Sequence, residues 1–143
     1  MANFLTNAYR NNLIGSDTFP NVQLDADTIS IMFIDNADDT IVVTDASLSD
    51  VASAARVPSA ASSPNLASKT LGVVGVGVFD ALDVTFTTLS GDQAEQLLLF
   101  KNTGSDATSI LIACWDTFTS GMPITPNGGD VTVQWNISGI FSV

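Results

Sequence analysis

The sequence contains no histidine and only one cysteine, Cys114. Histidine is the usual general base near neutral pH, the commonest metal ligand and the middle member of serine and cysteine triads, so these kinds of active site are excluded. A single cysteine cannot form a disulfide within the chain. Cys114 lies in the apolar run from Ile110 to Trp115, which predicts a buried small hydrophobic side chain and not an activated nucleophile. We therefore predict no catalytic residue, no cofactor and no enzymatic activity.

Basic residues are also scarce. Four Lys and Arg stand against fifteen Asp and Glu, which gives a formal net charge of −11. Such a charge repels phosphate backbones and anionic lipid surfaces, so we expect no nucleic-acid and no membrane partner. Charged residues make up only 13% of the chain and hydrophobic residues 45%. This composition excludes disorder driven by high charge and low hydrophobicity, and the length of 143 residues predicts one compact domain.

The chain has no long hydrophobic run. Its longest uncharged apolar stretch, Thr70 to Phe79, is about half as long as a membrane helix requires. Residues 1–12 lack the apolar segment of a secretory signal, so we expect the protein to remain in the cytoplasm in which it is made.

Short apolar runs rich in β-branched residues, separated by Asp, Gly, Asn and Pro, predict an all-β fold. In residues 28–35, for example, Ile29, Ile31 and Phe33 occupy alternate positions, as they do in a strand. We expect an antiparallel β-sandwich, jelly-roll-like, of about eight short strands. The expected strands are residues 28–35, 41–44, 71–79, 84–87, 96–100, 109–116, 131–136 and 140–143.

Three segments depart from the strand pattern. Residues 4–13 have apolar side chains at helical spacing and are followed by Gly15, which predicts a short N-terminal helix or arm within residues 1–20, ahead of a β-sandwich domain of residues 21–143. Residues 47–56 begin with a potential capping serine and are rich in Ala, which permits a short turn of helix. Residues 58–68 are almost all Ala, Ser, Pro and Asn, which predicts an exposed loop.

The N-terminal segment carries an apolar stripe, which makes it our candidate for self-association. Two alternatives are open: the segment crosses to a neighbouring copy as an arm, or it packs on its own sandwich. The residues of the stripe are Phe4, Leu5, Tyr9 and Leu13.

Aspartates occur in groups that can supply oxygen ligands to a hard cation: Asp25 with Asp27, Asp80 with Asp83, and Asp35 with Asp38 and Asp39. The run from Asp35 lacks the glycine at the sixth position and the glutamate at the twelfth that complete a calcium loop. Aspartate is also an ordinary residue in turns between short strands, so we interpret these groups as turn residues and predict no metal site.

Glycines and aromatic residues also have a structural and a functional interpretation. The spacing Gly72-x-x-Gly75-x-Gly77 matches no nucleotide-binding loop, so we interpret these glycines as marking bulges in a strand or a close approach of another backbone segment. Trp135 alternates with apolar residues and is expected in the core. Trp115 and Phe118 are the candidate aromatic contacts for a protein partner or a glycan.

Four linked segments resemble a widespread family of small tailed-phage proteins. The resemblance covers most of residues 65–143, with additional similarity at residues 28–35 and 48–57, and it departs from the family pattern at 58–68 and 71–78. The four segments are GVFDALDVTF (77–86), SGDQAE (90–95), FKNTGSDATS (100–109) and TPNGGDVTVQW (125–135).

Members of that family with an assigned role are virion structural proteins, including capsid cement or decoration proteins. The resemblance implies a protein of the outer capsid surface, made in the cytoplasm of the host bacterium, whose partners are the major capsid protein and further copies of itself in a homotrimer. Two alternatives remain. The first is a protein of the tail, neck or baseplate that acts as a structural adaptor or as a binder of host glycan through Trp115 or Phe118. The second is a small hydrolase or metal-dependent enzyme built on the Asp groups.

Overall fold

The structure, a computed structural model, describes residues 3–15 and 21–143. The expected all-β class is confirmed: strands dominate, and the described residues contain one short α-helix. The elements in chain order are β1 (Phe4–Leu5), α1 (Asn7–Leu13), β2 (Ile29–Ile34), η1 (Leu48–Asp50), η2 (Ser53–Ala55), β3 (Arg56–Val57), η3 (Ala60–Ser62), β4 (Thr70–Leu71), β5 (Val78–Asp80), β6 (Val84–Phe86), β7 (Gln96–Lys101), η4 (Asp106–Thr108), β8 (Leu111–Trp115), β9 (Val131–Val133) and β10 (Phe141–Ser142), where η denotes a 3-10 helix.

The largest sheet has five antiparallel strands in the order β1-β8-β7-β2-β3. All six residues of β2 are buried, because both faces of this sheet are covered. Phe33 and its partner Leu97 belong to one hydrophobic cluster, whereas Met32 and its partner Leu98 belong to another on the opposite face. A strand covered on both sides is apolar at nearly every position, which explains why its sequence shows little polar alternation.

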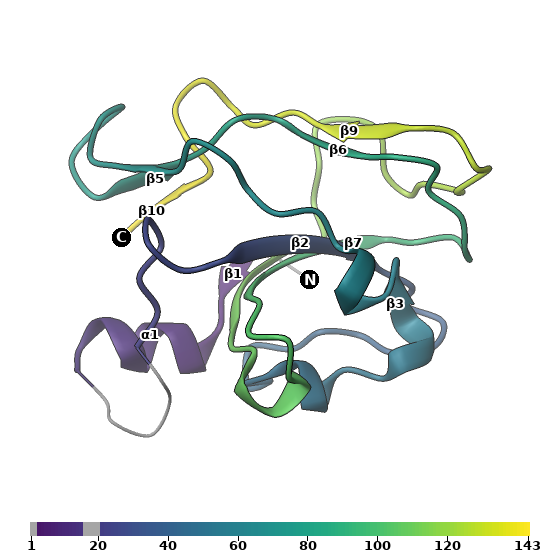
Figure 1. The fold of residues 1–143 in the computed structure, drawn as a ribbon, viewed down its shortest axis with the longest axis horizontal. Helices are drawn as coiled ribbons and strands as arrows, with labels where there is room; N and C mark the ends of the chain where they lie inside the picture. Colours follow the sequence, from purple (N-terminus) through teal and green to yellow (C-terminus); the bar gives the residue numbers. More distant parts are fainter. Residues whose placement is uncertain (1–2, 16–20) are drawn as a thin grey trace.

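Two smaller sheets, β10-β5-β4 and β6-β9, cover one face of the five-stranded sheet (Figure 1). Phe79 of β5 and Phe86 of β6 enter the same cluster as Phe33. The opposite face is covered by the chain that contains η1 and η2, through Leu48, Val51 and Ala55. The five-stranded sheet is therefore the middle of three layers. A jelly-roll-like sandwich stays a prediction.

The N-terminal segment packs on its own domain, the second of the two alternatives. Phe4 and Leu5 pair with Cys114 and Ala113 of β8. The Thr6 hydroxyl oxygen accepts a hydrogen bond from the Tyr9 N–H, which caps the start of α1. The predicted short N-terminal helix is present as α1, and β1 joins this segment to the five-stranded sheet. Residues 1–2 and 16–20 of the predicted segment 1–20 lie outside the described residues.

Two expected strands are absent from the structure. Residues 71–79 form a hairpin instead of one strand: β4 pairs with β5, and the chain reverses over residues 72–77. Gly72 and Gly77 have φ values of +70° and +74°, which other residues rarely adopt, so the glycines make the reversal and not a bulge. Residues 41–44 lie outside any strand because the Val42 N–H donates to the Asp45 carboxylate and the Asp45 N–H to the Val42 carbonyl.

The segments expected to be irregular are partly ordered. The predicted helical turns near residues 47–56 are present as η1 and η2. The predicted loop of residues 58–68 contains η3 and forms a bridge from Asn65 to Ser30 of β2. Leu66 is buried in the main cluster, so the expectation of an exposed loop is wrong there.

Candidate protein-interaction surface

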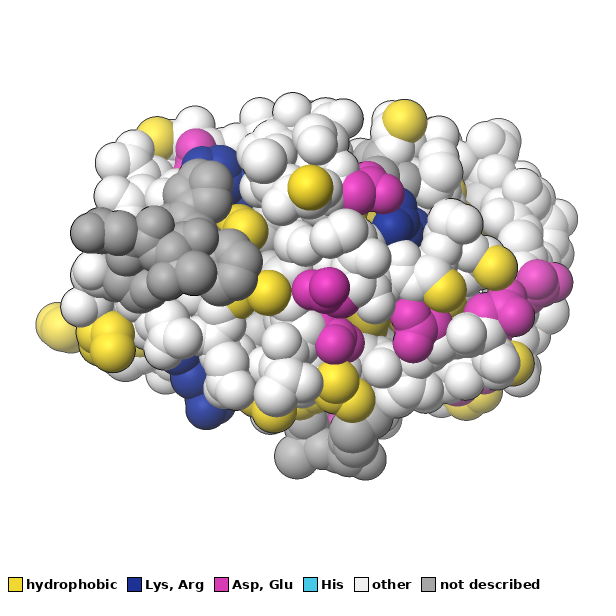
Figure 2. Space-filling view, turned by 90° about the horizontal axis from the view of Figure 1, so that it is seen from below, with side chains coloured by type: hydrophobic (Ala, Val, Ile, Leu, Met, Phe, Trp, Pro, Cys, Tyr) yellow, Lys and Arg dark blue, Asp and Glu magenta, His cyan; other side chains and the backbone are white. Residues whose placement is uncertain are grey.

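Exposed apolar side chains gather at one end of the molecule. The hairpin loop between β4 and β5 contributes most of them: Val73 is 76% exposed and Val76 101%. Figure 2 shows hydrophobic side chains protruding at the left end of the molecule. We call this surface the apolar end. Its residues are Leu13, Ile14, Leu71, Val73, Val74, Val76 and Val143.

Backbone hydrogen bonds hold the base of the hairpin. The Gly72 N–H donates to the Val78 carbonyl at 2.9 Å, and the Val143 N–H donates to the Gly77 carbonyl at 3.1 Å. A Cβ at Gly77 would lie 2.6 Å from the Val143 carbonyl oxygen, a separation that side-chain carbons do not tolerate. Glycine at this position therefore lets the C-terminal strand brace the hairpin, whose tip projects beyond β5 and β10 (Figure 1).

A groove of about 670 Å³ lies beneath the hairpin. Its walls are α1, the turn of residues 22–26, the hairpin and the C-terminal strand, and Tyr9 and Phe79 are among the side chains that line it. Among the described residues that line the groove, Asp25 carries the only charge. The groove extends the apolar end toward the core.

The turn that forms one wall of the groove is held by Asp27. Its carboxylate accepts hydrogen bonds from the Gln23 N–H at 2.7 Å and from Lys101 Nζ at 2.8 Å. Burial acts to raise the pKa of Asp27, but these hydrogen bonds and the positive charge of Lys101 outweigh it and hold the pKa below its usual value. Lys69 Nζ donates to the Asp27 carbonyl. Lys69 and Lys101 therefore both bond to Asp27 and stabilise this turn.

Carboxylates flank the apolar end. Asp25 is exposed beside the groove, and Asp80 ends β5 at the base of the hairpin. Among the described residues, neither forms an ion pair. Since residues 70–79 contain no charged side chain, the hairpin is an uncharged centre with Asp25 and Asp80 at its border. The exposed Arg10 lies in the last turn of α1, the helix that carries Leu13.

The structure separates the four residues predicted for self-association. Tyr9 is 2% exposed and contacts Phe141 edge-on, with ring centroids 6.0 Å apart. A side chain so deeply buried has no surface to offer a partner, so this part of the prediction is corrected. Phe4 and Leu5 pack against the two core clusters. Leu13 is exposed and belongs to the apolar end.

The candidate aromatic contacts lie elsewhere. Trp115 and Phe118 are half-buried against the main cluster, and neither lines the groove. The Trp115 ring lies 5.9 Å from the Trp135 ring at an angle of 52°. Trp135, expected in the core, is partly buried against the same cluster. The role of Trp115 and Phe118 in binding a partner stays a prediction.

In the structure, the predicted group of Asp35, Asp38 and Asp39 has Asp92 in place of Asp39. Carboxylate oxygens of Asp35, Asp38 and Asp92 lie within 4.8 Å of one another. Asp39 instead accepts hydrogen bonds from the Thr40 and Ala52 N–H groups. Asp35 also accepts a hydrogen bond from the Ala37 N–H, which is the turn role predicted for it. The sequence could not indicate Asp92, because a tertiary contact brings its loop to the turn.

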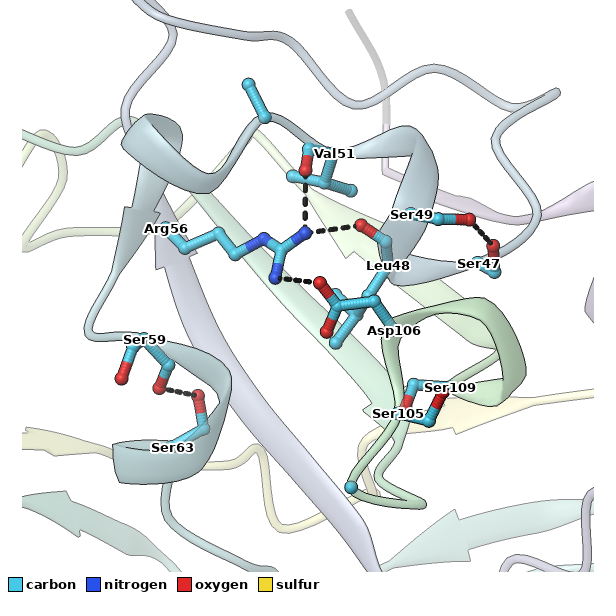
Figure 3. A network of polar contacts seen from close by, with 12 residues as sticks. Ser47, Leu48, Ser49, Val51, Arg56, Ser59, Ser63, Ser105, Asp106 and Ser109 are labelled. Carbon is cyan, nitrogen blue, oxygen red and sulfur yellow. Dashed lines mark hydrogen bonds and ion pairs between the residues drawn. The ribbon is translucent and has the colours of Figure 1, made fainter.

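A buried arginine connects the layer beneath the sheet (Figure 3). Arg56 Nη2 donates to the carbonyls of Leu48 and Val51 at 2.6 and 2.8 Å, and Nη1 pairs with the Asp106 carboxylate at 2.8 Å. The Leu48 carbonyl also accepts the Val51 N–H at 3.1 Å within η1, whereas the Val51 carbonyl lies beyond the end of this short helix. This contact is structural, and it lies on the opposite side of the sheet from the hairpin.

Cys114 is buried as predicted, with 1% of its surface exposed. Burial raises the pKa of its thiol to about 12, and the carboxylates of Asp116 and Asp45 add to the effect. A thiol with so high a pKa is almost fully protonated at neutral pH, and the thiolate is the nucleophile. Cys114 therefore fills space in the core.

No protein-family model and no curated protein matches this sequence. Within the described residues, no helix has the length and apolar character needed to cross a membrane. We therefore infer the function from the surface of the protein.

The apolar end was missed by the sequence analysis. The pattern of its central segment predicts one strand, with glycines at bulges or close backbone approaches, and no reversal of the chain. A usable signal was present, because three glycines interrupt the apolar run of residues 71–79 at short intervals. Glycines spaced in this way favour a tight reversal, and a reversal places its side chains at the surface.

Proposed function

We propose that the protein is a capsid cement protein of a tailed bacteriophage. It binds the outer surface of the assembled head and stabilises the shell by non-covalent contacts across the joints between capsomers. The apolar end carries this proposal, because solvent-exposed apolar surface with a polar border is typical of protein–protein interfaces. The resemblance to tailed-phage virion proteins supports the shell as the partner.

The proposed mechanism is thermodynamic linkage. A protein that binds the assembled shell but not its separated subunits stabilises the shell by an amount that grows with its concentration relative to Kd. No bond is made or broken in this process. The small all-β domain and its net charge of −11 suit the role, since a strongly acidic protein stays soluble and is repelled by packaged nucleic acid.

Symmetry suggests how the copies are arranged. A joint with local three-fold symmetry is matched by a partner of the same symmetry, so we propose that three copies occupy each such joint as a homotrimer. Contacts between these copies would use surfaces other than the hairpin tip, which is assigned to the shell.

A copy-number measurement tests the proposed function. The particle whose genome encodes this chain is purified, and the chain is quantified against the major capsid protein by mass spectrometry. We expect about one copy per shell subunit, or one trimer per three-fold joint. A few to a few dozen copies per particle would instead place the protein in the tail, neck or baseplate. Absence from the particle would contradict both assignments.

A further inference from the structure

The tip of the hairpin has the composition of a buried interface but is fully in solvent. Val73 and Val76 are among the most exposed large hydrophobic side chains in the described part of the chain. Isolated exposed apolar residues are common on proteins, whereas several on one projecting loop mark a contact site. The hairpin is therefore the part of the apolar end that can reach furthest into a partner.

The hairpin is also well ordered before it binds. Val78 donates its N–H to the Gly75 carbonyl at 3.1 Å within the loop, and the C-terminal strand bonds to Gly77 from outside it. The turn of residues 136–139 packs so closely that a Cβ at Gly139 would lie 2.3 Å from Val78 Cγ1. A braced loop loses little conformational entropy on binding, so its apolar side chains contribute most of their burial energy to affinity.

The charges around the tip restrict the partner. Asp25 and Asp80 flank the hairpin, neither paired with a described basic residue, and Lys69 is bonded to the Asp27 carbonyl. A second copy of this chain would bring its own Asp25 and Asp80 and its net charge of −11 against these carboxylates. Arg10 of α1, which is exposed, offsets only part of this unfavourable meeting of like charges. A pocket bordered by Lys or Arg would attract them.

We propose that the valine hairpin inserts into an apolar pocket of the shell whose border carries Lys or Arg side chains. This inference rests on the proposed function for the identity of the partner. The valines provide the buried centre of the contact, where most of the binding energy of an interface is concentrated. Asp25 and Asp80 provide the acidic border, which increases the rate of association and aligns the tip with the pocket.

The test measures binding of the purified chain to heads assembled without it, by sedimentation with the particles. Val76→Asp places a charge at the centre of the contact and is expected to weaken binding about a hundredfold or more, because the carboxylate would be buried unpaired. Val42→Asp is the matched control: the same substitution at a 39% exposed valine whose neighbour Ile41 belongs to the cluster on the opposite face of the sheet. It is expected to bind like the wild type.

The border is tested by charge removal. Asp80→Asn and Asp25→Asn are each expected to slow association several-fold at low salt and to reduce the dependence of association on salt concentration. A partner pocket with an uncharged border would leave the salt dependence unchanged, which would overturn the basic border. Urea unfolding of each variant verifies that the fold is intact, so a loss of binding is assigned to the contact.

The remaining outcomes separate this inference from the proposed function. If the wild-type chain does not bind the heads at all, the cement function is wrong. If the wild type binds and Val76→Asp binds equally well, the function stands and the hairpin is not the contact. If Val76→Asp changes the mass of the free chain in sedimentation equilibrium from oligomer to monomer, the hairpin contacts a second copy, and the shell pocket is overturned.

Discussion

At the scale of single residues, Arg56 performs a task that the sequence does not reveal. With four basic residues in the chain, each is expected on the surface, yet the Arg56 side chain is 9% exposed. Its planar guanidinium group donates to two carbonyls and a carboxylate at once, which a lysine cannot reproduce. Arg56 thus ties η1 and η4 to β3.

We predict that Arg56→Met lowers the free energy of unfolding by about 2–4 kcal/mol, because the carbonyls of Leu48 and Val51 lose a charged donor in a buried setting. Asp106→Asn should cost less than about 1 kcal/mol, since the Asp106 side chain is half exposed and its ion pair is weakened by solvent. Urea unfolding followed by circular dichroism measures both. Equal costs would show that the ion pair, and not the carbonyl contacts, carries the stability.

The buried thiol makes a prediction about alkaline pH. The pKa of Cys114 is about 12 in the folded chain, against 9.0 for an unperturbed thiol. Between these values the unfolded chain releases its proton and the native chain keeps it, so the free energy of unfolding falls as pH rises. From pH 8 to 10.5 we expect the wild type to lose about 2 kcal/mol more than Cys114→Ala in urea unfolding. Parallel losses would contradict the burial of the thiol.

At the scale of elements, the hairpin depends on a glycine at its base. Gly77→Ala is predicted to lower the free energy of unfolding by about 2 kcal/mol, because it combines a positive φ with a clash against the Val143 carbonyl. It should also weaken binding to heads, although every valine of the tip is retained. Gly72→Ala is the control: it has a similar φ, but the added carbon would meet only the Gly75 carbonyl oxygen at an ordinary contact distance of 4.0 Å, so about 1 kcal/mol is expected. Binding to heads that is unchanged by Gly77→Ala would argue against a braced tip.

For the N-terminal element, the structure predicts a larger effect of truncating Tyr9 on stability than the interpretation as an arm does. As an arm, it would spare the fold when Tyr9 is truncated. As a part of the core, Tyr9→Ala should lower the free energy of unfolding of the isolated chain by about 3–5 kcal/mol. Leu13→Ala, at the exposed end of α1, should cost less than about 1 kcal/mol. A small loss for Tyr9→Ala would return the segment to the role of an arm.

At the scale of the whole molecule, the uneven distribution of charge determines which partners the protein attracts. The net charge of −11 is spread over turns, while the hairpin is uncharged. The net charge therefore makes copies of the chain repel one another, and a basic partner attracts them.

The linkage mechanism predicts how the shell responds. Heads should melt at higher temperature as the concentration of added protein rises, with a gain in stability of about 2.7 kcal/mol per site at a hundredfold excess over Kd. Scanning calorimetry of heads at several protein concentrations measures this dependence. A melting temperature that does not change with bound protein would contradict a cement function, even if binding is observed.

The sequence by itself determined the fold class and the absence of several chemistries. Short apolar runs predicted the strands β2, β7 and β8, because each contributes apolar residues over a continuous length. The absence of histidine excluded triads without reference to any structure. The burial of Cys114 was also predictable, since its neighbours along the chain are apolar.

Only the tertiary structure decided which apolar residues are covered. Residues 71–79 and strand β2 are both apolar segments rich in β-branched residues. However, β2 is enclosed between two layers, whereas no layer covers the hairpin tip. Tyr9 was a candidate for self-association because its stripe has no visible partner in the sequence. In the structure β8 and Phe141, more than 100 residues away along the chain, cover it. Burial depends on contacts between distant segments, whereas a sequence pattern reports only the periodicity of its own segment.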